Sequence, residues 1–310
     1  MDGLSVIEID KSWIGGTELM AIGLEENILP IAPKLADWQW SQLPGKINLR
    51  EDGKNIIWVH LGEFEGHLSW LANPKIAYII FNSYYQYQRF IEYFPNIDQN
   101  KCRVIRNAIK PITPNATYKD GDKLKLVFHS EPYRGLDILL KSLQLIEDKD
   151  IELHVLGDLH TTTIDWKIDF QNKIKEMCKN DNRVVLHGRV SNDEVRKQLS
   201  ESHMFAYPST WRETSCIALV EALSAGLYCI TNSFTVLPET GIGLTQLYPF
   251  NWDSDRHAEI LALKIKEGIE AIKTNRFDQI SQIVKANDYY SWKNVSKEWI
   301  AFANEISMNY

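Results

Sequence analysis

The chain has 310 residues, with 44% apolar and 24% charged side chains, which is the balance of a globular protein large enough for two hydrophobic cores. Its formal net charge of −7 argues against a general nucleic-acid binder, because such proteins normally carry a basic domain or stripe. The acidic N-terminus MDGLSVIEID lacks the positive charge of a signal peptide, and no apolar run approaches the roughly 20 residues that span a bilayer. We therefore expect a cytoplasmic protein with no transmembrane segment, and peripheral membrane contact is left open.

In the first part of the chain, short apolar runs alternate with stretches of helical period, which is the pattern of βαβ units around a parallel sheet. The runs that predict strands are residues 6–9, 56–60, 76–81 and 103–105. A stretch with many turn residues, 111–122, then interrupts the pattern. It predicts a boundary between a first domain, residues 1–116, and a second domain, residues 117–291.

The same alternation restarts in the second domain. The predicted strands are residues 124–128, 152–156, 184–186, 204–207 and 227–231. The leucines at 136, 139, 140 and 143 follow the first of these strands with the spacing of one buried helix face. A further helix is expected at 164–177. Ser191 with Glu194 three residues later fits a capping box, so another helix should begin there.

Two helices complete the expected organisation. Residues 215–225 are helix formers throughout, and Gly226 is placed to end that helix. The last segment, 292–308, has amphipathic spacing and is expected to return to the first domain as helix 292–310. Two such modules in series imply a cleft between them.

A polar loop before the helix at 215–225 is the most informative stretch. Thr214 and Ser215 open the helix, where backbone N–H groups without internal partners and the helix dipole suit a diphosphate. An ordinary N-cap explains the same residues. Glu221 lies on an otherwise apolar helix, so its carboxylate is either solvent-facing or held for a polar ligand such as a ribose.

These residues resemble a known family. The segment from Glu213 to Glu221, followed by Ala222 and then Ala225-Gly226, is similar to the EX7E signature and EA..AG helix of retaining GT-B glycosyltransferases of family 4 type. Tyr207-Pro-Ser before the motif and Leu237-Pro-Glu after it agree in order and spacing. The resemblance implies an α/β fold of the GT-B type, with two Rossmann-like domains whose parallel sheets face a central cleft.

The resemblance also assigns donor-binding residues in the second domain. The family's phosphate-binding GR....KG segment corresponds to Phe128-His-Ser-Glu-Pro-Tyr-Arg-Gly135 here, so Arg134 replaces the Lys and His129 stands at the Arg. The planar fork of Arg134 suits a diphosphate. His129 departs from the pattern, and a histidine buried in the core explains this position equally well. Gly188 and Arg189, in His-Gly-Arg-Val, complete the donor set.

In the first domain, Ile-Gly-Gly-Thr-Glu resembles the family's glycine loop, which implies that Gly15 and Gly16 approach the donor and that Thr17 lies on the acceptor side; glycine pairs also occur in plain turns. His60 matches a histidine that reaches the donor sugar in several relatives. Trp38 and Trp40 are expected in an acceptor-side loop, although core packing is the usual fate of tryptophan.

The implied reaction is a retaining, metal-independent transfer of a sugar from a nucleotide-sugar donor, UDP- or GDP-linked, to a hydroxyl of a glycan, lipid-linked or other acceptor. Arg134 and the helix end at Thr214 and Ser215 stabilise the departing diphosphate, Glu221 holds the ribose, and Glu213 contacts the donor sugar. No cofactor is expected. A GT-B sugar-nucleotide epimerase and a catalytically silent nucleotide- or glycan-binding module remain as alternatives.

No metal site is expected either. Three DxD triplets, beginning at Asp120, Asp148 and Asp253, are each more typical of solvated loops than of a metal-dependent transferase. The four cysteines are far apart and have no metal-binding spacing, so we expect reduced and mostly buried thiols.

Overall fold

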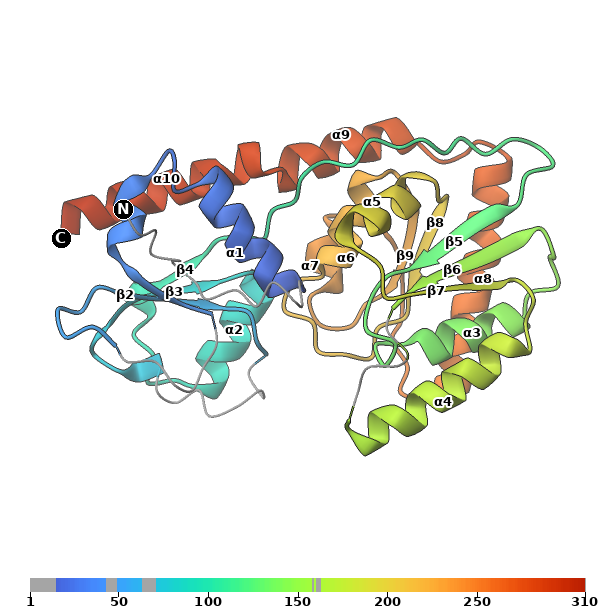
Figure 1. The fold of residues 1–310 in the computed structure, drawn as a ribbon, viewed down its shortest axis with the longest axis horizontal. Helices are drawn as coiled ribbons and strands as arrows, with labels where there is room; N and C mark the ends of the chain where they lie inside the picture. Colours follow the sequence, from blue (N-terminus) through green and yellow to red (C-terminus); the bar gives the residue numbers. More distant parts are fainter. Residues whose placement is uncertain (1–14, 43–48, 63–70, 158, 160–162, 310) are drawn as a thin grey trace. The chain divides into compact units, whose positions relative to one another are not determined.

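The computed structural model of the chain describes residues 15–42, 49–62, 71–157, 159 and 163–309. The chain forms two compact units (Figure 1). The first comprises Met1–Lys110, Glu213–Ile217 and Asp288–Tyr310; the second comprises Pro111–Arg212 and Ala218–Asn287. The strand expected at residues 6–9 lies outside the described residues.

The first unit contains a parallel sheet with the strand order β1-β2-β3-β4. Its strands are β1 (Gln39–Ser41), β2 (Asn55–Val59), β3 (Ile76–Phe81) and β4 (Cys102–Val104). All residues of β2 and β3 are buried, as expected for the apolar central strands of a parallel sheet. Three of the four strands coincide, within one residue, with the runs at 56–60, 76–81 and 103–105.

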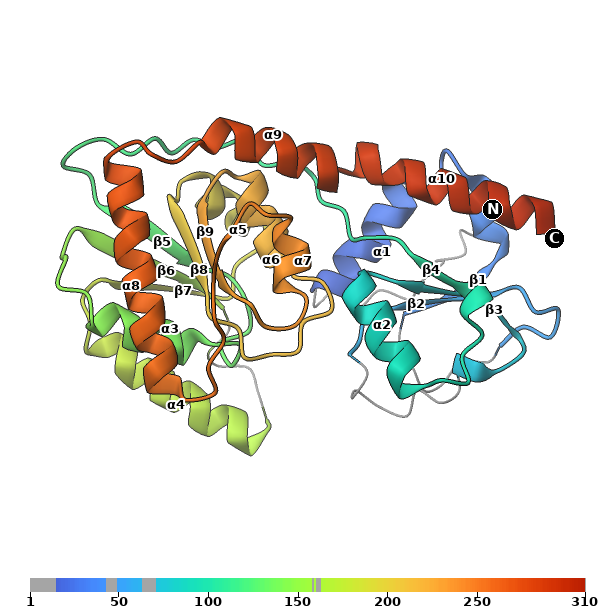
Figure 2. The same cartoon turned by 180° about the vertical axis from the view of Figure 1, so that it is seen from behind.

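Helices pack on both faces of this sheet (Figure 2). On one face, α1 (Gly16–Asn27), the 3-10 helix η1 (Pro33–Asp37) and α10 (Trp292–Asn309) share a core with alternate strand residues. On the other face, α2 (Tyr84–Tyr93) places Phe90 against Phe81 and Ile79. The predicted amphipathic helix at 292–308 is thus present, and its Val295, Trp299 and Ile306 are buried in the first unit.

The placement expected for Trp38 and Trp40 is wrong. Both side chains are 6% exposed, and Trp40 lies in β1 rather than in a loop. The Trp40 indole donates a hydrogen bond to the Leu35 carbonyl oxygen at 2.9 Å and packs on Trp299. Because both rings are buried in the core, they are not available to an acceptor.

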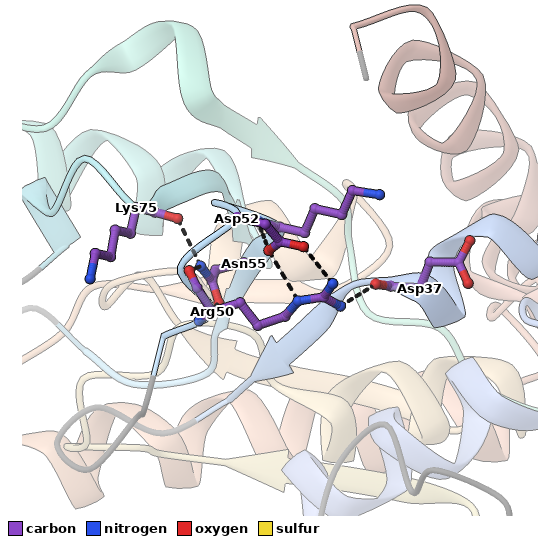
Figure 3. Close-up of polar contacts among 6 residues, drawn as sticks. Asp37, Arg50, Asp52, Asn55 and Lys75 are labelled. Atoms are coloured by element: carbon purple, nitrogen blue, oxygen red, sulfur yellow. Dashed lines mark hydrogen bonds and ion pairs between the residues drawn. The ribbon is translucent and has the colours of Figure 1, made fainter.

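Asn55 ties the loop before β2 to the sheet (Figure 3). This fully buried side chain accepts a hydrogen bond from the Arg50 backbone N–H at 2.9 Å and donates to the carbonyl oxygens of Arg50 and Lys75. The Arg50 guanidinium in turn binds Asp52 and the Asp37 carbonyl oxygen. This polar cluster fixes the amino end of β2, at the edge of the sheet opposite His60.

The second unit contains a six-stranded parallel sheet with the order β10-β9-β8-β5-β6-β7. Its strands are β5 (Leu124–Phe128), β6 (Ile151–Leu156), β7 (Val184–Gly188), β8 (Met204–Tyr207), β9 (Tyr228–Asn232) and β10 (Gln246–Tyr248). The chain adds β6 and β7 on one side of β5 and then places β8 on its other side. The order therefore reverses between β5 and β8, which is the point where open α/β sheets bind ligands.

Helices cover both faces of this sheet as well (Figure 1). On one face lie α3 (Leu136–Gln144), α4 (Asp165–Lys179) and α8 (Ser254–Lys273); on the other lie α5 (Asn192–Ser200) and α6 (Ile217–Ser224). The remaining helices are α7 (Leu237–Gly241) and α9 (Gln279–Tyr290). The capping box of Ser191 and Glu194 is present at α5.

Candidate functional site

The reversal in strand order brings two loops together at the carboxyl ends of β5 and β8. Residues 129–135 follow β5 and residues 208–212 follow β8. A hydrogen bond of 3.1 Å joins the Ser130 and Tyr207 hydroxyls across the two strands. The Asn232 side chain, at the end of β9, donates to the Ser209 carbonyl oxygen at 2.8 Å. The candidate site is therefore built on loops that the sheet holds in register.

Gly135 makes the close approach of the two loops feasible. It has φ +106°, a conformation that residues with a side chain rarely adopt. A Cβ placed there would lie 2.3 Å from the Pro208 carbonyl oxygen. Helix α3 begins at the next residue, so Arg134 stands directly before a helix N-terminus, where backbone N–H groups favour an anion.

Aromatic side chains surround Arg134. Its guanidinium carbon lies 5.6 Å from the centre of the Trp211 ring, within cation–π range. Tyr133 contacts the same indole edge to face at 5.4 Å, and the Lys167 Nζ lies 4.6 Å above the Tyr133 ring. The contact between Trp211 and Arg134 depends on the sheet order, because the two residues lie in loops that follow different strands.

Glu221, on α6, lies next to His129, which directly follows β5. The Glu221 Oε2 is 3.5 Å from the His129 Nε2, and its Oε1 is 3.9 Å from an Arg196 Nη1. The side chain of Glu221 is 14% exposed, so the carboxylate is held among polar groups rather than facing solvent. Sequence reasoning missed Arg196, because nothing in its local pattern connects α5 to α6.

His129 is buried, with its ring against Phe205 at 5.3 Å. Among the described residues, neither imidazole nitrogen has a hydrogen-bond partner, although Glu221 is within ion-pair distance. Buried polar atoms are normally satisfied, so these two nitrogens are an exception among the described residues, and only the Glu221 carboxylate lies near one of them. The sequence left His129 between a phosphate ligand and a core histidine; the structure places it beside the residue expected to hold the ribose.

In the first unit, His60 follows β2 in a polar setting. The Asn82 Oδ1 accepts a hydrogen bond from the Trp58 indole at 2.7 Å, which fixes the orientation of the amide. The Asn82 Nδ2 then faces the His60 Nδ1 at 3.3 Å as a donor. The Gln42 Nε2, which donates to the Thr17 carbonyl oxygen, faces the His60 Nε2 at 3.3 Å, so each ring nitrogen lies beside an amide N–H donor. The imidazole of His60 is thus held between two amide side chains, and it accepts through one of its nitrogens.

The segment that carries Glu213, Thr214 and Ser215 packs with the first unit. The Thr214 hydroxyl is 3.4 Å from the His60 carbonyl oxygen, and the Ser83 hydroxyl donates to the Thr214 carbonyl oxygen at 2.8 Å. Helix α6 begins only at Ile217, so Thr214 and Ser215 precede the helix instead of opening it. Glu213 is buried at 6% exposure.

The remaining predicted residues lie at element ends. Gly15 caps α1, and its backbone N–H donates to the Glu18 carboxylate at 2.9 Å; Gly16 is the first helical residue. The Thr17 carbonyl oxygen accepts from Gln42 at 3.2 Å. Gly188 ends the edge strand β7 with φ +70°, and Arg189 is exposed after it.

Within the described residues, no cluster of three or more His, Cys, Asp or Glu side chains could hold a metal ion. Asp253 caps α8 by accepting from the backbone N–H groups of Asp255 and Arg256, and Asp148 pairs with Lys273. All four cysteines are buried and outside disulfides, and burial raises the pKa of Cys102 to about 12 and that of Cys178 to about 11. These two thiols therefore stay protonated near neutral pH.

A hollow of about 700 Å³ lies elsewhere in the second unit. Its lining includes Tyr228 and Gln246, the first residues of β9 and β10, together with Glu267 and Arg276. It therefore opens at the amino edge of the sheet. Parallel sheets bind their ligands at the carboxyl edge, so we do not assign the donor to this hollow.

His60 gives a pH-dependent prediction. Burial lowers its pKa from 6.5 to about 3, so the folded chain keeps the imidazole neutral where the unfolded chain takes up a proton. The contribution of this group to the free energy of unfolding is complete above pH 6.5 and is lost as the pH falls towards 3. The free energy of unfolding, measured with urea, should therefore fall between pH 7 and pH 5 by about 1 to 2 kcal/mol more in the parent than in His60→Gln, since a pKa unit is worth about 1.4 kcal/mol. Equal losses in the two proteins would contradict this account.

The architecture just described defines a class. Two units, each with a parallel sheet covered by helices, are the features of the GT-B fold, and the second sheet has the strand-order reversal at which such sheets bind ligands. Solved structures agree. A glycosyltransferase from Rickettsia africae matches with a TM-score of 0.69 and 15% identity, over 98% of this chain and 85% of that one. Anabaena HepE in complex with UDP matches with a TM-score of 0.65 and 15% identity, over 81% and 72% of the two chains.

The family follows from sequence comparison. Residues 113–275, just over half of the chain, match the model for glycosyl transferases group 1, and the chain belongs to this family. Curated relatives include two subunits of phosphatidylinositol N-acetylglucosaminyltransferases: gpi3 from Schizosaccharomyces pombe, 26% identical over 65% of this chain, and one from the human enzyme, 28% identical over 66%. This chain spans 43% and 41% of their lengths. Among the described residues, no helix has the length and hydropathy needed to cross a membrane.

Proposed function

We propose that this chain is a retaining, metal-independent glycosyltransferase that moves a hexose or N-acetylhexosamine from a UDP-linked donor to a hydroxyl of a glycan or lipid-linked acceptor. The solved relative HepE is bound to UDP, and a second HepE structure also holds glucose. The curated relatives are named as N-acetylglucosaminyltransferase subunits. These names support a UDP-sugar over the GDP-linked alternative.

The observation that carries the proposal is the placement of Arg134 at the strand-order reversal. Its guanidinium and the N-terminus of α3 provide fixed positive charge at the position where α/β sheets bind phosphates. As the bond between the sugar and the diphosphate breaks, negative charge grows on the leaving group. Preorganised donors stabilise that charge without having to reorient.

The nucleoside side of the donor would meet His129 and Glu221. A carboxylate accepts hydrogen bonds from two ribose hydroxyls, and the Glu221 oxygens are already oriented by His129 and Arg196. Gly188 and Arg189, after β7, remain assigned to the donor by the resemblance of their motif.

Glu213 and His60 are proposed for the sugar. The His60 imidazole, oriented by Asn82 and Gln42, is proposed to form a hydrogen bond with a sugar hydroxyl. Thr214 and Ser83 hold the backbone next to Glu213. With Glu213 as a contact rather than a nucleophile, the acceptor attacks on the face that the diphosphate leaves, and the configuration is retained.

Proton NMR of UDP-glucose and UDP-N-acetylglucosamine incubated with the protein and excess EDTA tests this proposal. Slow hydrolysis, with water as the acceptor, should release the α-anomer first, because the α-linked donor reacts with retention. Addition of Mg²⁺ or Mn²⁺ should leave the initial rate unchanged. Initial release of the β-anomer, a rate that requires metal, or conversion of the intact nucleotide sugar into an epimer would each contradict it.

A further inference from the structure

An aromatic cluster lies at the carboxyl edge of the second sheet, apart from the residues assigned above. Phe234 follows β9, and Phe250 and Trp252 follow β10. The rings of Phe234 and Phe250 are stacked, with centres 4.2 Å apart and planes at 15°. The Trp252 ring stands perpendicular to Phe250 at 4.7 Å and is 71% exposed. We call these three residues the aromatic platform.

Hydrogen bonds and a helix cap fix the loops that carry the aromatic platform. The Asn232 Oδ1 accepts from the Phe234 backbone N–H at 3.0 Å, and Asp253, next to Trp252, caps α8. Thr235 has φ +52°, an uncommon conformation for a β-branched residue, and strain of this kind persists only where the surroundings enforce it. The indole is thus presented to solvent by a fixed loop.

A hydrogen-bonded chain connects the platform to the loop that carries Trp211. The Asn232 Nδ2 donates to the Ser209 carbonyl oxygen at 2.8 Å and lies 3.5 Å from the His257 Nε2. The Tyr248 hydroxyl is 2.9 Å from the same nitrogen, and Phe250 packs on the imidazole. Because β8, β9 and β10 are adjacent and parallel, the platform and the Arg134 crevice open on one edge of the sheet.

We propose that the aromatic platform binds a pyranose ring of the carbohydrate acceptor, with Trp252 as the stacking surface. The inference rests on the proposed function, which requires a sugar or sugar-bearing acceptor at this edge. The C–H face of a pyranose is apolar and packs on an aromatic face, whereas its hydroxyls stay in water. Next to the platform, Asp253 is exposed, Asp255 pairs with Lys141 and Arg256 pairs with Glu259, so the patch has no excess of positive charge that would favour an anionic membrane surface.

A glycan array tests the proposal with the intact chain. The parent is expected to bind a subset of immobilised oligosaccharides, and Trp252→Ala to weaken that binding about tenfold, as loss of one stacking contact predicts. Trp252→Phe should recover part of it. Ile280→Ala, which truncates a 76% exposed side chain on α9 of the same unit, is the matched control and should bind like the parent.

Two further measurements separate this inference from the proposed function. Thermal stabilisation by UDP-sugars should be the same in the parent and in Trp252→Ala; loss of it only in the variant would mean that the platform holds the nucleotide, and would overturn the proposal. Co-sedimentation with phosphatidylcholine and phosphatidylserine vesicles that depends on Trp252 would overturn it in favour of a lipid surface. Array binding that Trp252→Ala leaves unchanged, or a parent that binds no glycan, would overturn it as well. If UDP-sugars fail to stabilise even the parent, the proposed function itself fails.

Discussion

Replacement of Arg134 by Ala is expected to lower kcat/KM for UDP-sugar hydrolysis or transfer by about 10²- to 10³-fold, the usual effect of removing one preorganised donor from a developing negative charge. Arg134 lies just before the N-cap of α3, and its guanidinium carbon lies 5.6 Å from the centre of the Trp211 ring. Most of the loss should appear in kcat, because the diphosphate charge grows only as the glycosidic bond breaks.

Initial rates of UDP release measure this effect. Arg134→Lys should recover part of the activity, since it keeps the charge and loses the planar fork. Arg256→Ala is the matched control: that arginine pairs with Glu259 on the exposed side of α8, and its loss should leave the rate unchanged. A rate for Arg134→Ala within a few-fold of the parent would remove Arg134 from the mechanism.

Replacement of Gly135 by Ala is expected to destabilise the second unit strongly. The backbone at φ +106° costs a side-chain-bearing residue about 1 to 3 kcal/mol, and the clash with the Pro208 carbonyl oxygen adds about 1 to 3 kcal/mol more. The loops after β5 and β8 must then separate, so UDP-sugar binding should be lost together with stability.

Urea unfolding measures the loss of stability, and Gly121→Ala separates the cost of the backbone conformation from that of the clash with Pro208. Gly121 has φ +90° but would place its Cβ in open space, so its substitution reports the backbone cost alone. We expect a loss of about 1 to 3 kcal/mol for Gly121→Ala and about twice as much for Gly135→Ala. Equal losses would show that the approach of Pro208 is not a constraint.

The sequence predicts the central strands β8 and β9 of the second unit well because every residue in them is buried, whereas β10, with two exposed residues, gave no such signal. The ranges 124–128 and 204–207 coincide with β5 and β8, and Ser191 with Glu194 predicts the start of α5. Local signals of this kind depend only on neighbours in the chain, so they predict an element without knowledge of the fold.

The first unit is predicted less completely, for a physical reason. Strand β1 has only three residues, and polar side chains lie on both sides of Trp40 in it. A pattern this short cannot be distinguished from a loop. The burial of Trp38 and Trp40 depends on partners far along the chain, Tyr78 and Trp299, which no local pattern reveals. The start of α6 shifted for a similar reason, because Thr214 bonds to His60 instead of capping the helix.

In the candidate site, residue types could be predicted and their contacts could not. The motif from Glu213 to Glu221 identifies both carboxylates, but only the sheet order places Glu221 beside His129 and Arg196. The cation–π contact of Arg134 with Trp211 likewise joins two loops that are far apart in the sequence, so no local pattern predicts it.

Thermal stabilisation by UDP-sugars, without metal, compared between the parent and Glu221→Ala tests the central claim most directly, since a ligand that binds only the folded state must raise its apparent stability. We expect a concentration-dependent rise in Tm for the parent. In Glu221→Ala the dissociation constant should increase about 10- to 100-fold, because hydrogen bonds to a charged group contribute about 1.5 to 3 kcal/mol. An equal rise in the two proteins, or no rise in a folded parent across UDP-glucose, UDP-galactose and UDP-N-acetylglucosamine, would contradict a donor site built around Glu221.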